Sequence, residues 1–598
     1  MEKYMSTQTT GAENVRWDLS ELFSGLDDPK IETTLSESRE KAEKFVKLYR
    51  GKLGSLSPEE LATAYNELEA ISGPLYRLGM FVNLEYAVDT ADDKIKALLG
   101  KIEQHSSTTS NLLVFFSLEL GNLSDDQFAK FDGADALKDF EYKIAKMRKN
   151  ARYNLSEKEE QVINLKDLNG SNAHQKLYGE LTASFSFEFE MDGETKTLNG
   201  DQLRALRQHP DPGVRQRAMK MFFAKYEENA LIINHLYNAL VKDHGIEVDM
   251  RGFDQPISTM NTHNDLSDEA IQALNDVTTE SYSLVNRYYK LKAKMLGMDE
   301  MTLADIYAPL PQSSKAYPFE DAKKLVLDGF KSFDNDFYEM AKAMFDENRI
   351  DAPVEPKKRG GAFCASSTPD LKPYVLLNYT GKVRDVSTMA HELGHAIHAM
   401  LSSKQKLMNY HSILPLAETA SIFSEMVLTD SLLKKETDVE VKKSMLTGKL
   451  EDIFASSHRQ NMFSSFEVAS HAAINKELQS PQALCGLYTT ELKKMFGDSV
   501  KFTDEYAWEW SSIPHIFNVP FYVYAYNFGN LLVFALYQQY LEEGDSFIPK
   551  YKEFLSMGSS ASPADLTAIV NADINHPDFW RKSLKYIETL VDQLEELV

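Results

Sequence analysis

The chain has 598 residues, enough for several domains or for one large helical enzyme with a deep cleft. Its formal net charge of −25, from 65 Lys and Arg against 90 Asp and Glu, argues against binding to nucleic acid or to an anionic membrane surface. The two cysteines, Cys364 and Cys485, exclude a disulfide framework and are typical of a reducing compartment.

Residues 1–183 have a predominantly helical pattern. The N-terminal stretch lacks the apolar core of a signal peptide, so we expect a cytoplasmic protein. Helical periodicity runs from residue 28 to about 150, with breaks predicted at 51–58, 73–74 and 121–125, and resumes over 153–181. We interpret residues 1–183 as an N-terminal helical domain.

The periodicity changes at residue 184. Residues 184–191 alternate apolar and polar side chains, Asp192-Gly193 is a hairpin turn signal, and residues 195–198 alternate again. The sequence therefore predicts a β-hairpin over 184–200, which we take as a domain boundary, with a second domain over 201–598.

The second domain continues with long helices over 201–251, 266–298 and 319–348. Between residues 350 and 385 the composition shifts to Gly, Pro, Ser and strand-forming residues, and 374–379 predicts a strand. An extended peptide could add to the edge of this strand through backbone hydrogen bonds. An ordinary structural hairpin is the alternative.

A His-Glu-x-x-His motif follows on a predicted helix, at residues 391–395. At helical spacing, His391, His395 and His398 share one face, and either Asp385 or Ser387 can cap the start of the helix. Residues four apart lie about 5–6 Å from each other, close enough for two imidazoles to bind one Zn²⁺. The opposite face is apolar and consists of Val386, Met389, Ala390, Leu393, Ile397, Met400 and Leu401.

Glu392 lies beside the histidine pair, about 100° round the helix. From there it can reach a water molecule on the metal more easily than the metal itself. Zinc lowers the pKa of such a water to about 7, and a carboxylate can carry its proton to a leaving amine. The motif predicts metal-assisted hydrolysis of an amide.

A hydrolytic zinc site usually has a third protein ligand. His398 is on the right face, but three imidazoles over nearly two turns of one helix span too far to converge on one ion, so packing or hydrogen bonding is its alternative role. Glu418, Ser421 and Glu425 share a face of a second predicted helix, with Pro415 in its first turn. One of these carboxylates can complete the metal site while the other orients a ligating histidine.

The late stretch between Glu509 and Glu542 contains no Asp, Glu, Lys or Arg, and its length would permit a membrane span. Pro514, Pro520 and several Asn and Gly residues interrupt it, and Pro520 would break a continuous helix. We expect no membrane segment here.

Together these motifs resemble a known family. The run His391-Glu-Leu-Gly-His395-Ala-Ile-His398 with Glu418-Thr-Ala-Ser421-Ile-Phe-Ser-Glu425 is similar to the signature of the thimet-type zinc oligopeptidases. Residues 17–23, Asp192-Gly193 and residues 359–363 resemble the oligoendopeptidase F branch, and the similarity covers nearly the whole chain. The resemblance implies a mainly α fold, with a deep channel that admits short peptides and a small β element beside the zinc helix.

The resemblance also implies individual roles. His391, His395 and Glu418 would bind one Zn²⁺ per chain, Glu392 would be the catalytic base, and Glu425 would support a ligand. In a late segment, His515, Tyr522 and Tyr526 match the residues that hold the substrate carbonyl and steady the oxyanion, with Tyr524 as an alternative. Such donors can be worth about 3–4 kcal/mol. A structural aromatic core is the other interpretation of these tyrosines.

The expected function is a zinc endopeptidase that hydrolyses internal bonds of short oligopeptides, which makes 201–598 the catalytic zinc peptidase domain. A peptidyl-dipeptidase would use the same site with a cationic clamp for the terminal carboxylate, and we find no such clamp in the sequence. A helical peptide-binding scaffold, with a structural metal or none, would have no use for Glu392.

Overall fold

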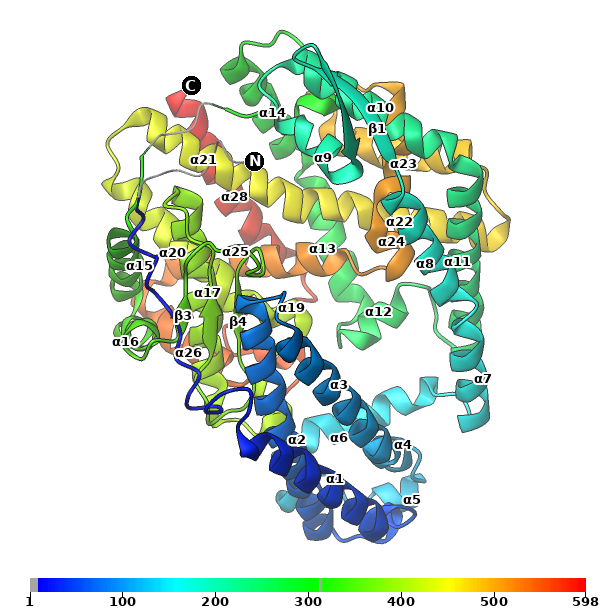
Figure 1. The fold of residues 1–598 in the computed structure, drawn as a ribbon. Coiled ribbons are helices and arrows are strands. Elements are labelled where there is room, and N and C mark those ends of the chain that lie inside the picture. Colours follow the sequence, from blue (N-terminus) through cyan, green and yellow to red (C-terminus); the bar gives the residue numbers. More distant parts are fainter. Residues whose placement is uncertain (1–8, 311–314) are drawn as a thin grey trace. The chain divides into compact units, whose positions relative to one another are not determined.

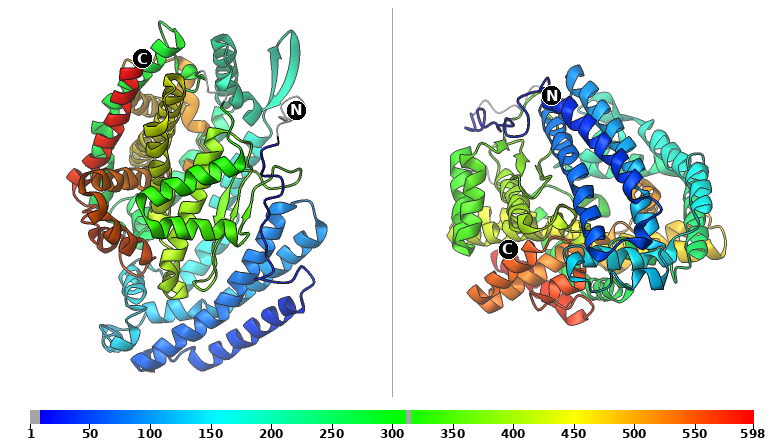
Figure 2. Two further views of the ribbon diagram at one scale, coloured as in Figure 1. Left: turned by 90° about the vertical axis from the view of Figure 1, so that its left-hand side faces the viewer. Right: turned by 90° about the horizontal axis from the view of Figure 1, so that it is seen from below.

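The computed structural model describes residues 9–310 and 315–598, which are mainly helical with two small sheets (Figures 1 and 2). The chain folds into two compact units. Unit 1 comprises Met1–Arg152, Ser314–Lys435 and Tyr540–Ala572, and unit 2 comprises Tyr153–Ser313, Glu436–Gln539 and Asp573–Val598. Each unit is therefore assembled from three separate segments. The division into 1–183, 184–200 and 201–598 stays a prediction.

Unit 1 contains an N-terminal group of helices, the second sheet and the helices that follow it. Its elements are α1 (Pro29–Tyr49), α2 (Pro58–Val88), α3 (Asp93–Leu113), α4 (Phe115–Gly121), α5 (Asp125–Phe128), α6 (Glu141–Asn150), α15 (Phe319–Phe333), α16 (Asn335–Asp346), β3 (Ile350–Asp351), β4 (Phe363–Ala365), β5 (Tyr374–Leu376), α17 (Val383–Leu401), α18 (Leu407–Tyr410), α19 (Leu414–Ala417), α20 (Thr419–Lys435), α26 (Phe547–Ser556) and α27 (Pro563–Ala568).

Local sequence signals begin the first two helices. Asp28 caps α1, which opens on Pro29, and Ser57 and Glu60 form a capping box at the start of α2. The break predicted at 73–74 is wrong, because α2 continues through Pro74. An interior proline costs a helix about 3 kcal/mol, but the residues that α2 buries on both sides of it offset that cost through packing.

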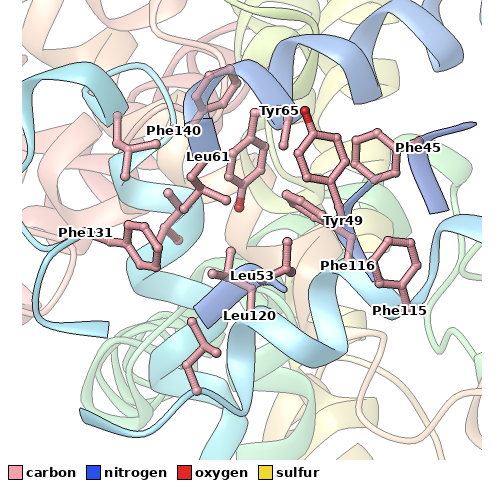
Figure 3. Close-up of a cluster of buried hydrophobic side chains, with 14 of the residues drawn as sticks. Phe45, Tyr49, Leu53, Leu61, Tyr65, Phe115, Phe116, Leu120, Phe131 and Phe140 are labelled. Atoms are coloured by element: carbon pink, nitrogen blue, oxygen red, sulfur yellow. The ribbon is translucent and has the colours of Figure 1, made fainter. Parts of the chain in front are cut away.

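A core of unit 1 lies among these N-terminal helices and is rich in aromatic residues (Figure 3). The rings of Phe45 and Phe116 have centroids 5.5 Å apart, and Tyr65 stacks on Phe140 at 4.6 Å. Contacts of this kind add about 0.5–1.5 kcal/mol each to the burial of apolar surface.

The sheet of unit 1 has the strand order β3-β5-β4. β5 is central, since it pairs parallel with β3 and antiparallel with β4. The prediction that a peptide adds to the edge of strand 374–379 is therefore wrong for Tyr374–Leu376, both of whose edges are covered. Within the described residues, β4 has no strand on its outer side, and it packs against α17.

Unit 2 contains the first sheet and long helices. Its elements are α7 (Glu157–Asp167), α8 (Ser171–Ala183), β1 (Ser186–Met191), β2 (Glu194–Asn199), α9 (Gly200–Ala205), α10 (Pro212–Glu228), α11 (Ala230–Arg251), α12 (Ser258–His263), α13 (Asp268–Glu280), α14 (Tyr282–Leu296), α21 (Val439–Ile453), α22 (Arg459–Lys476), α23 (Pro481–Phe496), α24 (Pro514–Asn518) and α28 (Pro577–Leu597), and α25 (Tyr524–Glu543) crosses the boundary between the units.

The predicted hairpin is confirmed as β1 and β2. Asp192 and Gly193 both have positive φ, as a tight turn of this kind requires. The interruption expected at Pro520 is also present, between α24 and α25. Over the described parts of the chain, no helix combines the length and the apolar character that crossing a bilayer needs.

Candidate active site

Helix α17 carries the His-Glu-x-x-His motif on a buried support. Val386, Met389 and Leu393 of the predicted apolar face are fully buried. The predicted cap is wrong by three to five residues: Lys382 is the cap, α17 begins at Val383, and Asp385 lies in its first turn. The Asp385 carboxylate accepts a hydrogen bond from the Lys382 backbone N–H at 3.1 Å, which satisfies a free donor at the helix start. The motif therefore begins about two turns inside the helix.

Gly394 lets α17 and α20 approach closely. A Cβ on Gly394 would lie 2.6 Å from both the Ala420 carbonyl oxygen and the Ser421 Cα, closer than packed atoms allow. The absence of a side chain thus sets the separation of the two helices. A glycine inside a helical pattern is a signal for such a close contact, but the pattern alone does not identify α20 as the partner of Gly394.

Glu418 lies at the junction of two helices. We expected one helix running from Pro415 through Glu425, but α19 ends at Ala417 and α20 begins at Thr419. Ser421 donates a hydrogen bond to Glu418 Oε2 at 2.7 Å. The same oxygen lies 3.3 Å from His391 Nε2 and 3.2 Å from His395 Nε2.

These three side chains fit a metal ion. Their ligand atoms lie within 4.8 Å of one another, and no other such group of three is found among the described residues. Two zinc bonds of about 2.0–2.1 Å at the tetrahedral angle put their ligand atoms about 3.3–3.4 Å apart. The two distances from Glu418 are close to this value. Two imidazoles and one carboxylate are also a donor set of hydrolytic zinc sites.

Glu425 supports the first histidine from behind. Its Oε1 lies 2.7 Å from His391 Nδ1, so that Nε2 is directed toward Glu418. Burial alone would lower the pKa of His391, but the hydrogen bonds to Glu418 and Glu425 outweigh it and raise this pKa to about 10. The reciprocal hydrogen bonds from His391 and His395 outweigh burial at Glu418 and hold its pKa well below the usual range.

Glu392 is buried beside the metal-binding group. Burial raises the pKa of its carboxyl, His391 and His395 oppose this, and Glu418 and Glu425 add to it. A cavity of about 350 Å³ in unit 1 brings together Glu392, the three candidate ligands, and Phe363, Cys364 and Ser366 around β4. A carboxylate that is shielded from solvent and lies next to a metal-binding position is suited to proton transfer.

His398 is not part of the metal-binding group found among the described residues. It is buried and hydrogen-bonds the backbone of Ala417, the residue before Glu418. Burial lowers the pKa of His398 to about 4, so its ring is neutral near pH 7. Of the two roles considered, the structure supports packing and hydrogen bonding.

His515, Tyr522 and Tyr526 gather in unit 2. The His515 ring is parallel to that of Tyr522 at 6.2 Å, and the two tyrosine rings are 5.3 Å apart. Tyr526 is 39% exposed, and burial together with a hydrogen bond to Tyr522 raises its pKa to about 12. Burial lowers the pKa of His515. The Tyr526 hydroxyl and the His515 ring are therefore neutral near pH 7.

Tyr524 differs from its neighbours. Its side chain is fully buried, and its hydroxyl accepts a hydrogen bond from Asn264 Nδ2 at 2.9 Å. The alternative that Tyr524 contacts the oxyanion is therefore not supported, and this tyrosine belongs to the core of unit 2. The helical turn of α25 explains the difference, since positions 524 and 526 face different sides.

Comparison with known proteins agrees with this geometry. Residues 205–586 match the model of peptidase family M3, and residues 119–187 match that of Oligopeptidase F. The chain belongs to peptidase family M3. An oligoendopeptidase F homolog of Borreliella burgdorferi is 27% identical over 592 residues, 98% of each chain. Oligopeptidase PepF of Bacillus subtilis is 26% identical over 92% of this chain and 82% of its own.

Solved structures share the fold of this M3 peptidase. A protein from Chlamydophila abortus superposes with a TM-score of 0.90 at 24% identity over 99% of each chain. The oligoendopeptidase F of Enterococcus faecium gives a TM-score of 0.70 at 22% identity, over 95% of this chain and 98% of that one. By the match to the family model, the chain is an M3 metallopeptidase with a candidate metal site at His391, His395 and Glu418, and it is similar to oligoendopeptidase F homologues over nearly its whole length.

Proposed function

We propose that the protein is a zinc endopeptidase that hydrolyses internal bonds of short oligopeptides. The observation that carries this proposal is the convergence of His391, His395 and Glu418 next to the buried Glu392. The names of the relatives, oligoendopeptidase and oligopeptidase, support peptides as substrates. The deep channel that the resemblance implies stays a prediction.

The two imidazoles and Glu418 would hold the zinc ion. When bound, the ion supplies a Lewis acid for the scissile carbonyl and lowers the pKa of water. Glu392 takes one proton from the attacking water while the oxygen of that water forms a bond to the carbonyl carbon. Glu392 then passes this proton to the amide nitrogen as the C–N bond breaks. One water is consumed, and a carboxylic acid and an amine are released, which become a carboxylate and an ammonium group when the second proton of the water moves from the acid to the amine.

His515, Tyr522 and Tyr526 would stabilise the substrate carbonyl. A neutral phenol or imidazole donates a hydrogen bond to developing negative charge without bringing a competing carboxylate. The clustering of the three rings in unit 2 supports a common role.

The outer edge of β4 would hold the peptide backbone. Phe363–Ala365 is unpaired on this side within the described chain, and Phe363 and Cys364 line the same cavity as Glu392. An extended peptide that pairs with β4 is held through main-chain hydrogen bonds, regardless of most of its side chains.

The decisive variant is Glu392→Gln, which keeps the shape of the side chain and removes its basicity. We expect the variant to bind one zinc ion per chain by elemental analysis and to lose at least about a hundredfold in kcat. Glu553→Gln, at an exposed position of α26, is the matched control and should retain full activity. Near-normal turnover by Glu392→Gln would exclude Glu392 as the base.

The cleavage position separates an endopeptidase from a peptidyl-dipeptidase. Peptides of graded length, blocked at both ends, should be cut at internal bonds, as read by mass spectrometry of the products. Release of C-terminal dipeptides alone, and only from peptides with a free carboxylate, would favour the dipeptidase.

A further inference from the structure

Unit 2 contains a second cavity, of about 380 Å³, that the metal site does not account for. Three arginines line it: Arg204 and Arg207 follow the hairpin, and Arg459 begins α22. Glu509 is the one carboxylate among its lining residues, and His515 also lines it. Three guanidinium groups against one carboxylate leave a net charge of about +2 in a chain whose net charge is −25.

Arg459 has a donor without a partner in this cavity. The residue is 7% exposed, and its Nη2 forms an ion pair with Glu509. Its Nη1 is buried and makes no hydrogen bond to any described residue. The Glu509 carboxylate is shared, since its Oε2 accepts a hydrogen bond from the Tyr488 hydroxyl at 2.7 Å. A buried guanidinium N–H without an acceptor costs free energy, and Arg459 carries this cost at the wall of the cavity.

Arg207 and Arg204 are held by aromatic rings. The Arg207 guanidinium lies 4.1 Å from the ring centroid of Tyr307, and that of Arg204 lies 4.7 Å from Phe222. A guanidinium that stacks on a ring can direct its in-plane donors to a planar acceptor. Arg204 also donates a hydrogen bond to the Ser512 carbonyl at 3.4 Å. In the described part of the chain, neither arginine forms an ion pair with a carboxylate.

The charge of Arg207 is incompletely balanced. Burial lowers the pKa of its guanidinium, and the neighbouring Arg459 and Arg204 act in the same direction. Tyr307 and Glu509 offset this only in part. An anion in the cavity would relieve the repulsion among the three arginines.

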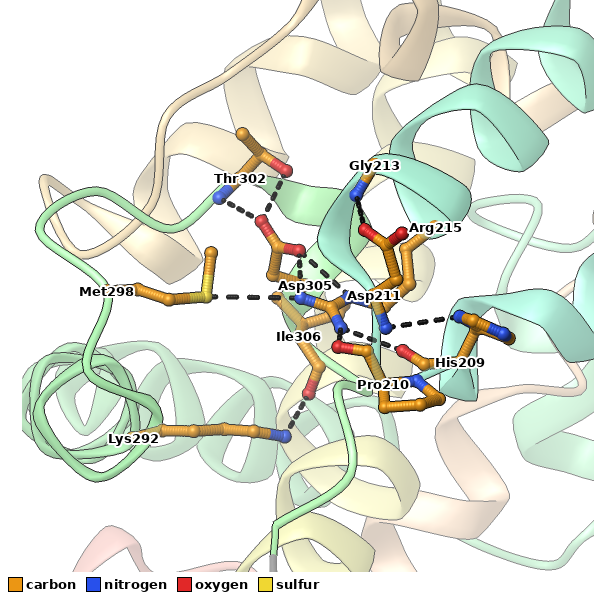
Figure 4. A network of polar contacts seen from close by, with 10 residues as sticks. All are labelled: His209, Pro210, Asp211, Gly213, Arg215, Lys292, Met298, Thr302, Asp305 and Ile306. Atoms are coloured by element: carbon orange, nitrogen blue, oxygen red, sulfur yellow. Dashed lines mark hydrogen bonds and ion pairs between the residues drawn. The ribbon is translucent and has the colours of Figure 1, made fainter.

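Buried polar contacts fix the wall of the cavity (Figure 4). Arg215 of α10 is fully buried and pairs with Asp305 at 2.7 Å, and Lys292 donates a hydrogen bond to the Ile306 carbonyl at 2.7 Å. Leu303 and Ile306, on either side of Asp305, line the cavity. The wall is therefore held in place before any ligand arrives, which reduces the cost of ordering on binding.

We propose that this arginine cavity binds a carboxylate of the peptide substrate. The inference rests on the proposed peptidase function, because the anionic groups of an ordinary peptide are carboxylates. Planar guanidinium groups match a carboxylate through two parallel hydrogen bonds. Phe222 and Phe463, which line the same cavity, suit the apolar part of a side chain. The carboxylate comes either from a Glu or Asp side chain or from the peptide C-terminus.

The test uses Arg207→Met, which removes the charge and keeps most of the volume. Arg217→Met is the matched control, since Arg217 also lies over a ring, that of Phe189, and does not line the cavity. Three kinds of peptide based on one sequence are compared. The first is blocked at both ends and uncharged, and the second is a set blocked at both ends in which Glu replaces one residue at a time. The third is blocked only at the N-terminus and has its C-terminal carboxylate as its one charge.

We expect the wild-type protein to favour an anionic peptide over the neutral one in kcat/KM, and Arg207→Met to reduce that ratio about tenfold or more. Arg217→Met should leave the ratio unchanged. A gain with Glu identifies a side-chain carboxylate, and a gain with the free C-terminus identifies the terminal one. A ratio that Arg207→Met does not change would overturn the proposal.

Direct binding separates this proposal from the peptidase function. Isothermal titration of the same peptides into full-length protein carrying Glu392→Gln measures affinity without cleavage. Tighter binding of an anionic peptide, lost with Arg207→Met, would support the cavity even if the wild-type protein cleaved no peptide. Equal affinity for anionic and neutral peptides would refute it even in an active peptidase.

Discussion

The backbone N–H of Phe521 donates a 2.9 Å hydrogen bond to Oε1 of Glu467, a fully buried residue of α22. Phe521 has a φ of +59°, in the left-handed region that residues with a Cβ rarely adopt. Its ring packs on His471, with 4.4 Å between centroids. The hydrogen bond and the buried ring together offset a strain of about 1–2 kcal/mol. Because Phe521 directly precedes Tyr522, this contact fixes the position of the Tyr522 backbone.

The pairing predicts a pH-dependent stability. Burial raises the pKa of Glu467 from 4.5 to about 8, although the Phe521 N–H opposes it. A raised pKa contributes stability that is complete below the unfolded value and is lost as pH rises through the folded value. Glu467→Gln does not titrate, so we expect wild type to lose stability relative to this variant between about pH 4.5 and 8.

Urea unfolding at several pH values measures this difference. The free energy of unfolding of wild type should fall against that of Glu467→Gln by up to about 1.4 kcal/mol for each pH unit in the window. Glu477→Gln changes an exposed residue at the end of the same helix, so the difference in unfolding free energy between wild type and this variant should not change with pH. A difference between wild type and Glu467→Gln that is constant with pH would show that Glu467 titrates normally.

Removing the support of His391 should weaken metal binding. In Glu425→Gln, the amide is a poorer acceptor for His391 Nδ1–H than the carboxylate at 2.7 Å. We expect zinc affinity to fall about 10–100-fold, as read by competition with a chromogenic chelator. Glu553→Gln should bind zinc like wild type, and an unchanged affinity in Glu425→Gln would mean that this contact does not orient the ligand.

Gly394 and Gly448 offer opposite outcomes for the same substitution. A helix interior usually gains up to about 1 kcal/mol from Gly→Ala, and Gly448 of α21 has open space around it. At Gly394 the new methyl would meet the backbone of α20, so we expect Gly394→Ala to lose about 1–3 kcal/mol of stability. Thermal unfolding of both variants checks this. Equal stabilisation by the two substitutions would show that α20 can move away from the added methyl group without loss of stability.

Tyr526 and Tyr524 should separate catalysis from packing. Tyr526→Phe removes the hydroxyl of a partly exposed side chain, and we expect kcat to fall about 10²–10³-fold with little change in stability. Tyr524→Phe removes the buried partner of Asn264, which should cost about 1–3 kcal/mol of stability. Steady-state kinetics and urea unfolding of both variants decide. A normal kcat in Tyr526→Phe would remove Tyr526 from the proposed site.

Much of the metal site could be predicted from sequence because its chemistry is local. The spacing of His391 and His395 and the buried face of α17 follow from helical periodicity. The hairpin follows from the turn chemistry of Asp192-Gly193. Glu418 was found as a ligand candidate from its motif, although the helix breaks at that residue.

Other features depend on contacts between distant segments. The arginine cavity joins Arg204 and Arg207 to Arg459, about 250 residues later in the chain. Glu467 and Phe521 are brought together in the same way. The predicted helix break at Pro74 is wrong for a related reason, because the packing of α2 outweighs the local preference of proline. The spacing of these residues in the sequence does not predict such pairings.

The alternation of the chain between two units has a consequence for synthesis. Unit 1 needs residues 540–572, and unit 2 needs α28, whose Trp580, Ile587 and Val591 are fully buried. Domains usually fold as they leave the ribosome, beginning with the first one made. Here α17 and α20 must wait for α26, which is translated about 110 residues later. A nascent chain stalled before residue 540 would expose both unfinished cores, and should be a ready target for chaperones.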